Sequence, residues 1–138
     1  MSRIRRLPRD RRGVVALEFA IVGPILIFLL LAIIEISLLG WTQVVLQLTA
    51  AQTARCVGIG SSACADSTQF AVDTATNWLF ANSVTTDGVS VLPGATCGSA
   101  PGHYVKVTIT SQFLGTSALP GILGGGQLSA QACYFTGA

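Results

Sequence analysis

The sequence predicts an α+β protein, in which a long N-terminal helix precedes a small disulfide-stabilised head with a short helix and an antiparallel β-sheet. Three observations lead to this fold class. An apolar run extends from Val14 to Ile34, and an amphipathic helical pattern continues it. Segments that alternate with the two-residue period of strands follow in the C-terminal part.

The composition points to a membrane or an assembly rather than to a free cytosolic protein. The chain has 138 residues, which suffices for one domain of ordinary size. Hydrophobic residues make up 51% of it and charged residues only 10%. Soluble domains average about 25% charged residues.

The charge is divided unequally along the chain. Residues 1–12 hold six arginines and Asp10 as their single acid, whereas residues 13–138 hold Arg55 and Lys106 against five acids. The basic cluster lacks interleaved aromatic residues and adjoins the apolar run, which disfavours nucleic acid as a partner. The positive-inside rule therefore predicts a cytoplasmic N-terminus and an exported head.

The apolar run is predicted to span a membrane over about residues 14–35. Its 21 residues contain Glu18 as their only ionisable group, and a helix of that length reaches roughly 30 Å. A cleavable secretory signal is the competing interpretation, but its core has about 7–15 residues and a small-residue cleavage site. The residues after Ile34 do not form such a site. Pro24 is predicted to kink the helix, as neighbouring membrane helices allow.

The same helix is predicted to continue beyond the membrane, to about residue 57. Leu38, Trp41, Val45 and Leu48 recur at helical spacing and predict a stripe that packs on the head. Trp41 is expected to be an interfacial anchor, and Glu35 to mark the exit into the periplasm.

The remaining residues, 58–138, are predicted to form the head. Asp66 and Gln69 form a candidate capping pair for a short helix that ends near Asn82. Trp78 is expected in the core, because it shares a helical face with Ala71 and Ala75.

Three segments of the head are predicted to be strands: "GVSVL", "HYVKVTIT" and "QLSAQACYF". In the second, Val105, Val107 and Ile109 fall on one face, and His103 is expected half exposed at its entry. The glycine-rich loop Phe113–Gly126 is either a flexible cover over the sheet or a contact surface for another subunit.

Four cysteines, Cys56, Cys64, Cys97 and Cys133, all follow the apolar run. An even number in an exported segment predicts two disulfides, and four cysteines allow three connectivities. We favour Cys56–Cys64 with Cys97–Cys133. A metal site is poorly supported, because no CxxC pair occurs and His103 is the sole histidine.

The sequence gives no support for an enzyme, a cofactor or a small-molecule substrate. "GIGSSA" fits a loose dinucleotide pattern, but no strand precedes it. Cys97 would need His103 as a base, and a disulfide is the favoured role for this cysteine. We therefore predict no catalytic residue.

Glu18 allows two interpretations. It lies close enough to the cytoplasmic interface to remain hydrated, which would need no further role. Alternatively, cleavage after Gly13 would create an α-amine on Val14, which is largely protonated at neutral pH. That cation could pair with Glu18 of a neighbouring subunit and set the register between their helices.

The string "RRGVVALEFAIVGPILIFLLLAIIE" resembles the type IV pilin-like class, and more specifically the TadE-like family of tight-adherence (Flp-type) pilus systems. The resemblance rests on Ala16, on Glu18-Phe19-Ala20 and on Pro24, and covers about residues 11–35. It implies a pseudopilin or minor pilin whose leader, residues 1–13, is removed by a prepilin peptidase of the inner membrane. It also implies pilins and pilus assembly proteins as partners, with Glu18 serving processing, assembly or both, and Phe19 serving assembly.

A second hypothesis keeps the leader in place. The chain would then be an uncleaved single-pass protein that presents a periplasmic binding or scaffold module. Gly13 directly before the apolar run, with Glu18 five residues further on, favours the first hypothesis, because a simple anchor needs neither residue.

Overall fold

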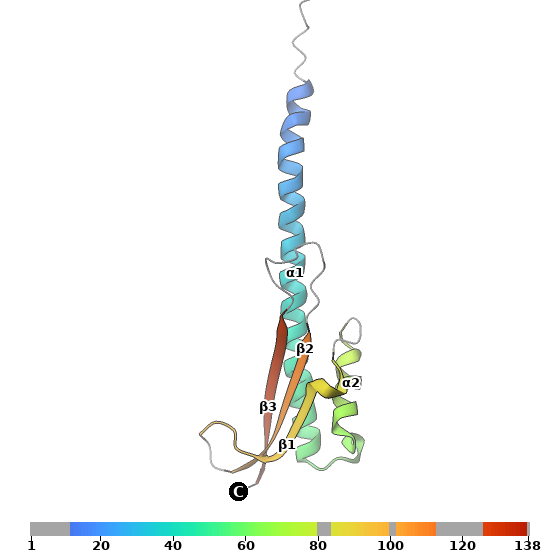
Figure 1. Cartoon of the computed structure of the whole chain (residues 1–138), viewed down its shortest axis with the longest axis vertical. Helices are drawn as coiled ribbons and strands as arrows, with labels where there is room; N and C mark the ends of the chain where they lie inside the picture. Colours follow the sequence, from blue (N-terminus) through green and yellow to red (C-terminus); the bar gives the residue numbers. More distant parts are fainter. Residues whose placement is uncertain (1–11, 80–83, 100–101, 113–125, 138) are drawn as a thin grey trace, which may run out of the picture. The chain divides into compact units, whose positions relative to one another are not determined.

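The computed structural model describes residues 12–79, 84–99, 102–112 and 126–137. The predicted fold class is confirmed: a long helix precedes a short helix and a three-stranded antiparallel sheet (Figure 1). The chain forms two compact units, Met1–Ile34 and Glu35–Ala138. The predicted loop at residues 113–126 lies, apart from Gly126, outside the described residues.

Helix α1 spans Arg12–Gly58, so that its N-terminal half belongs to the first unit and its C-terminal half to the second. A glycine-dependent turn ends it. Ser61 N–H donates to the Cys56 carbonyl, and Gly60 N–H donates to the Val57 carbonyl. These two hydrogen bonds form a Schellman motif, which requires a left-handed residue after the helix. Gly60 supplies it at φ 66°.

Helix α2 spans Ser67–Thr76 and is preceded by a short 3-10 turn at Ser62–Cys64. Asp66 caps it as predicted, because its Oδ1 accepts from the Gln69 N–H at 3.0 Å. Gln69 does not complete a capping box, since its side chain donates to Asp73 instead. The predicted end near Asn82 is wrong: the helix ends at Thr76 and a turn follows.

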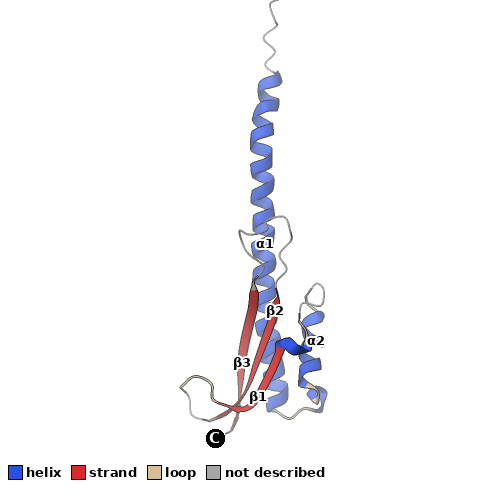
Figure 2. Cartoon of the chain, in the orientation of Figure 1, coloured by secondary structure: helices blue, strands red, loops and turns tan. Residues whose placement is uncertain are grey.

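The sheet has the order β1-β2-β3, with β1 at Val89–Ala95, β2 at His103–Gln112 and β3 at Gln127–Gly137 (Figure 2). Both pairings are antiparallel, and Val107 of β2 is opposite Val91 of β1 and Ala132 of β3. A register shift interrupts the first pairing between Leu92 and Ala95. All three strands lie where the sequence predicts them.

One hydrophobic core holds the second unit together, with α1 against one face of the sheet (Figure 1). The alternation predicted for β2 is confirmed, because Val105, Val107 and Ile109 are all buried. From α1, the core takes Val45, Leu46, Ala50 and Ala54.

The packing stripe predicted on α1 is only partly correct: Val45 is buried and Leu38 is half-buried. Trp41 and Leu48 are exposed, and the buried polar positions Thr49 and Thr53 lie on the packing face instead. The buried face of α1 therefore combines Val45 and Leu46 with the smaller residues Ala50 and Ala54 and the two threonines.

Candidate functional site

The apolar half of α1 presents its side chains outward all round. Every large hydrophobic residue from Val14 to Ile34 is exposed within the first unit. By length and composition, α1 is the one helix among the described residues able to cross a membrane, and only 6% of its most apolar window is buried. A helix that is apolar on every side, without protein over it, is typical of a membrane span.

Gly13 and Val14 lie in the first turn of α1, which begins at Arg12. A Cβ added to Gly13 would meet no described atom within 4 Å. The first four N–H groups of a helix have no partner inside it, so this turn is the one that unwinds most easily. The predicted cleavage position therefore lies in the turn of α1 that unwinds at the lowest free-energy cost.

Glu18 lies on the exposed surface of α1, one helical turn after Val14. It makes no ion pair or hydrogen bond within the described part of the chain. A carboxylate at a membrane helix centre costs about 2.5–3.5 kcal/mol, and the cost falls toward the interface. Water, a headgroup or a partner that is not among the described residues must therefore solvate or pair with this carboxylate.

Phe19 is 76% exposed, and its ring passes beside Gly23, where an added Cβ would lie 3.7 Å from Cε1. The helix continues through Pro24, which cannot donate a hydrogen bond to the Ala20 carbonyl. Phe19, Ala20 and Pro24 thus gather within two turns. The kink at Pro24 stays a prediction.

Glu35 opens the second unit, and its side chain is only 6% exposed. The sequence expects this residue to mark the exit from the membrane, and its burial was not foreseen. A buried carboxylate needs hydrogen bonds or charged neighbours.

The two tryptophans of the chain meet in the second unit. The Trp41 Nε1–H donates to the Trp78 carbonyl oxygen at 3.2 Å, and the two side chains are 48% and 57% exposed. The prediction that Trp78 lies in the core is wrong. Because α2 ends at Thr76, the helical period no longer applies, and Leu79 fills the core position instead.

The edge of the sheet carries two contacts that sequence reasoning missed. Gln43 Nε2 donates to the Ser129 carbonyl at 3.1 Å, and Gln47 Nε2 donates to the Gln131 carbonyl at 2.9 Å. The only signal in the sequence is the spacing of the two glutamines, which places both amides on one face of the helix.

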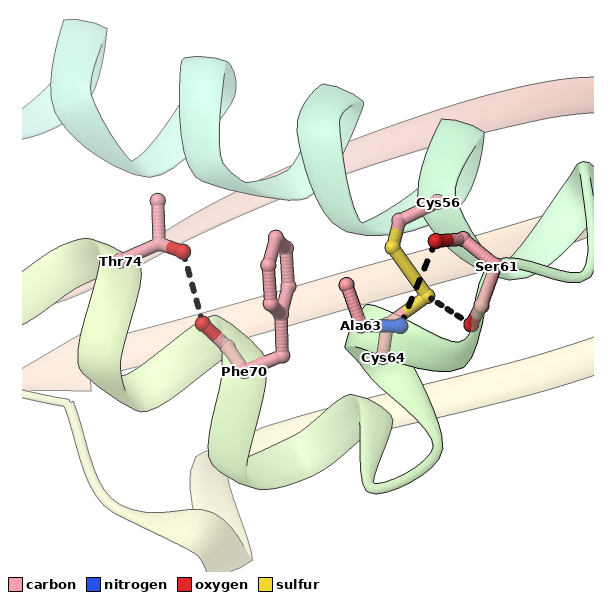
Figure 3. Close-up of a disulfide and its surroundings, with 6 residues drawn as sticks. All are labelled: Cys56, Ser61, Ala63, Cys64, Phe70 and Thr74. Carbon is pink, nitrogen blue, oxygen red and sulfur yellow. Dashed lines mark hydrogen bonds between the residues drawn. A yellow bond between two sulfur atoms is a disulfide. The ribbon is translucent and has the colours of Figure 1, made fainter.

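Two disulfides cross-link the head, with the connectivity that the sequence analysis favours. Cys56–Cys64 joins the end of α1 to the following turn, where the Cα atoms are 6.2 Å apart. Figure 3 shows Ser61 beside this bond and the Phe70 ring pointing from α2 toward α1. Cys97–Cys133 joins the β1–β2 connection to β3 across a Cα distance of 6.4 Å.

The described residues contain no group of three histidine, cysteine or acidic side chains that could hold a metal. Cys97 is consumed in a disulfide, and His103 is exposed at the start of β2. Hydrogen bonds from the Gln69 N–H and the Thr68 hydroxyl lower the pKa of Asp66. This shift follows from helix capping and does not indicate a reactive site.

Comparison with known protein families gives one match. Residues 13–55 match the model of the family described as TadE-like protein, which covers less than a third of the chain. No curated protein matches the chain. No solved structure matches it either.

The matched residues include Gly13, Glu18, Phe19 and Pro24, and they extend through Trp41 almost to the end of α1. The match and the long apolar helix indicate a membrane-anchored protein with a role of the pseudopilin kind, associated with the Tad pilus. The resemblance to the TadE-like family is thereby confirmed over residues 13–55, which match the model of that family.

Proposed function

We propose that this chain is a TadE-like pseudopilin or minor pilin, a structural and assembly component of a tight-adherence (Flp-type) pilus or a related secretion machinery. Residues 1–13 are its leader, and a prepilin peptidase cleaves after Gly13. One observation carries the proposal. Glu18 lies exposed on an apolar helix, one turn after Val14, inside the segment that matches the family.

Cleavage would give this pair of residues complementary charges. The new α-amine of Val14 is largely protonated at neutral pH. Val14 and Glu18 are four residues apart on one helix. The Val14 amine of one chain therefore meets Glu18 of its neighbour only when one helix is shifted along its axis by the length of those four residues. Pairing across two helices neutralises both charges near the hydrocarbon and sets the register of assembly.

The charge distribution supports the orientation. Six arginines in residues 1–12 retain the N-terminus in the cytoplasm, and the head with its disulfides folds in the periplasm. The partners are the inner membrane, the prepilin peptidase, other pilins or pseudopilins and the pilus assembly platform. The protein needs no cofactor, metal, nucleic acid or small-molecule substrate for this role.

The first test is the intact mass and N-terminal sequence of the protein from its native membranes. A chain that starts at Val14 supports processing. A chain that starts at Met1 or Ser2, in cells with an active prepilin peptidase, contradicts it and favours the uncleaved anchored module.

The second test separates assembly from folding. Glu18→Gln should reduce incorporation into pilus complexes, whereas the charge-preserving Glu18→Asp should retain part of it. Both variants should form the Cys97–Cys133 disulfide normally, because Glu18 lies outside the unit that contains it. Normal assembly of Glu18→Gln would remove the pairing role.

A further inference from the structure

The two tryptophans form an exposed aromatic pair at one place on the head. Trp41 and Trp78 are 37 residues apart in sequence, yet the indole of the first donates to the backbone of the second at 3.2 Å. The pair forms because α2 runs back along α1 after the turn at residues 59–66 (Figure 1). Both rings remain about half exposed, so neither of them is used to fill the core.

The pair lies close to the end of the apolar run. Trp41 follows Glu35 by six residues, which is about 9 Å along a helix. Each polar layer of a bilayer is roughly 5–8 Å thick. Long side chains on a helix lean toward its N-terminus, and on α1 that is the apolar end. The Trp41 indole is therefore expected to lean toward Glu35, and its Nε1–H meets the Trp78 carbonyl.

We propose that Trp41 and Trp78 together form an interfacial anchor that holds the head on the headgroup layer of the bilayer. Tryptophan favours this layer, because its ring is apolar and its N–H is polar. The hydrogen bond from Trp41 fixes the Trp78 backbone, so that the head has a second contact with lipid beside the helix itself. The inference rests on the membrane-anchored part of the proposed function.

The contact of the two tryptophans with the bilayer depends on their indole rings rather than on charge. Between residues 13 and 138 the only cations are Arg55 and Lys106, so attraction to anionic lipid contributes little. The contact depends on the indole rings and should therefore be insensitive to salt and to anionic lipid content.

The chain allows a direct test, because it contains only two tryptophans. Trp41→Phe leaves Trp78 as the sole indole, and Trp78→Phe leaves Trp41. Each full-length variant is incorporated into vesicles of phosphatidylethanolamine and phosphatidylcholine. The lipids carry bromine on their acyl chains, either near the headgroup or near the terminal methyl groups. Flotation first establishes that the protein is anchored.

We expect shallow bromine to quench either tryptophan roughly twofold more than deep bromine does. Adding salt or phosphatidylglycerol should not change this ratio. Wild-type protein serves as the reference, since the hydrogen bond from Trp41 is intact there.

Two results would overturn the anchor. In the first, Trp78 stays unquenched in Trp41→Phe, wild type shows no more quenching than Trp41 alone shows in Trp78→Phe, and Trp78 remains accessible to acrylamide, which would place it in bulk water. If it is instead shielded from acrylamide without any quenching by bromine, a protein neighbour covers it. In both cases the protein still floats, so the membrane-anchored role stands; failure to float would instead count against the proposed function.

Discussion

Gln47 of α1 donates from Nε2 to the carbonyl oxygen of Gln131 in β3 at 2.9 Å, one helical turn beyond the matching bond from Gln43 to Ser129. Strand β3 is an edge of the sheet, and such edges offer unpaired carbonyls to other chains. A step of four residues on a helix rises about 6 Å, and a step of two residues on a strand about 6.8 Å. The two amides thus match alternate carbonyls and cover the edge.

Replacing both glutamines should expose this edge. Gln43→Leu with Gln47→Leu removes two hydrogen bonds, which should lower the free energy of unfolding by about 1–3 kcal/mol in total. The exposed edge should also promote self-association. Chemical denaturation and light scattering measure the two effects. Gln52→Leu on the exposed surface of α1 is the matched control. If it changes stability and self-association as much as the double variant does, the contacts of Gln43 and Gln47 do not protect the edge.

Gly58 should not tolerate alanine. A Cβ at this position would collide with the Tyr134 ring, which lies directly against the end of α1. Overpacking of this kind costs about 1–3 kcal/mol. Gly40→Ala is the control in the same helix, because its Cβ would meet no described atom within 4 Å and alanine is the better helix former. Thermal unfolding should show a lower melting temperature for Gly58→Ala and no decrease for Gly40→Ala. Equal melting temperatures of the two variants would contradict the contact with Tyr134.

The cap of α2 should make stability depend on pH in acid. Hydrogen bonds from Gln69 N–H and the Thr68 hydroxyl lower the pKa of Asp66 below its ordinary value of 3.8. A lowered pKa in the folded state stabilises the protein above the unfolded pKa, and this contribution is lost as pH falls through the folded pKa.

Asp66→Asn tests this dependence, since asparagine caps helices about as well but does not titrate. The wild-type melting temperature should fall more steeply below pH 4 than that of the variant. Parallel curves would show that Asp66 does not contribute to the acid response.

The two disulfides should differ in their contribution to stability. In the chain-entropy description, cross-links that separate 36 and 8 residues stabilise by about 4 and about 2.5 kcal/mol. Removing Cys97 and Cys133 together should therefore lower the denaturation midpoint more than removing Cys56 and Cys64. The reverse order would mean that native contacts at the end of α1, rather than loop closure, dominate.

The sequence predicted the elements better than the way they pack. Alternation in β2 is a local pattern with one buried face, and it correctly placed Val107 and Ile109 in the core. The packing face of α1 was not predictable from large apolar residues, because the membrane-proximal part of the helix exposes Trp41 and Leu48 and buries Ala50. Hydrophobic periodicity shows that a helix has a face, but the partner decides which residues lie on it.

The candidate site was readable where it depends on local spacing. Gly13, Glu18 and Pro24 form a linear pattern, and the family match at residues 13–55 includes all three. Trp78 was misplaced because it lies two residues beyond the end of α2, where the helical period no longer holds. The contacts of Gln43 and Gln47 join residues more than 80 positions apart, and no local pattern encodes them.

The pairing of the first helix with the last strand has a consequence for the order of folding. Gln47 and the buried face of α1 make their contacts with β3, which spans Gln127–Gly137, so the core cannot close until β3 has emerged. Contacts of such long sequence separation slow folding, since the chain must close a large loop before they stabilise it. Until then α1 keeps an uncovered apolar face, and a chaperone that recognises this face would have its longest opportunity during synthesis and export.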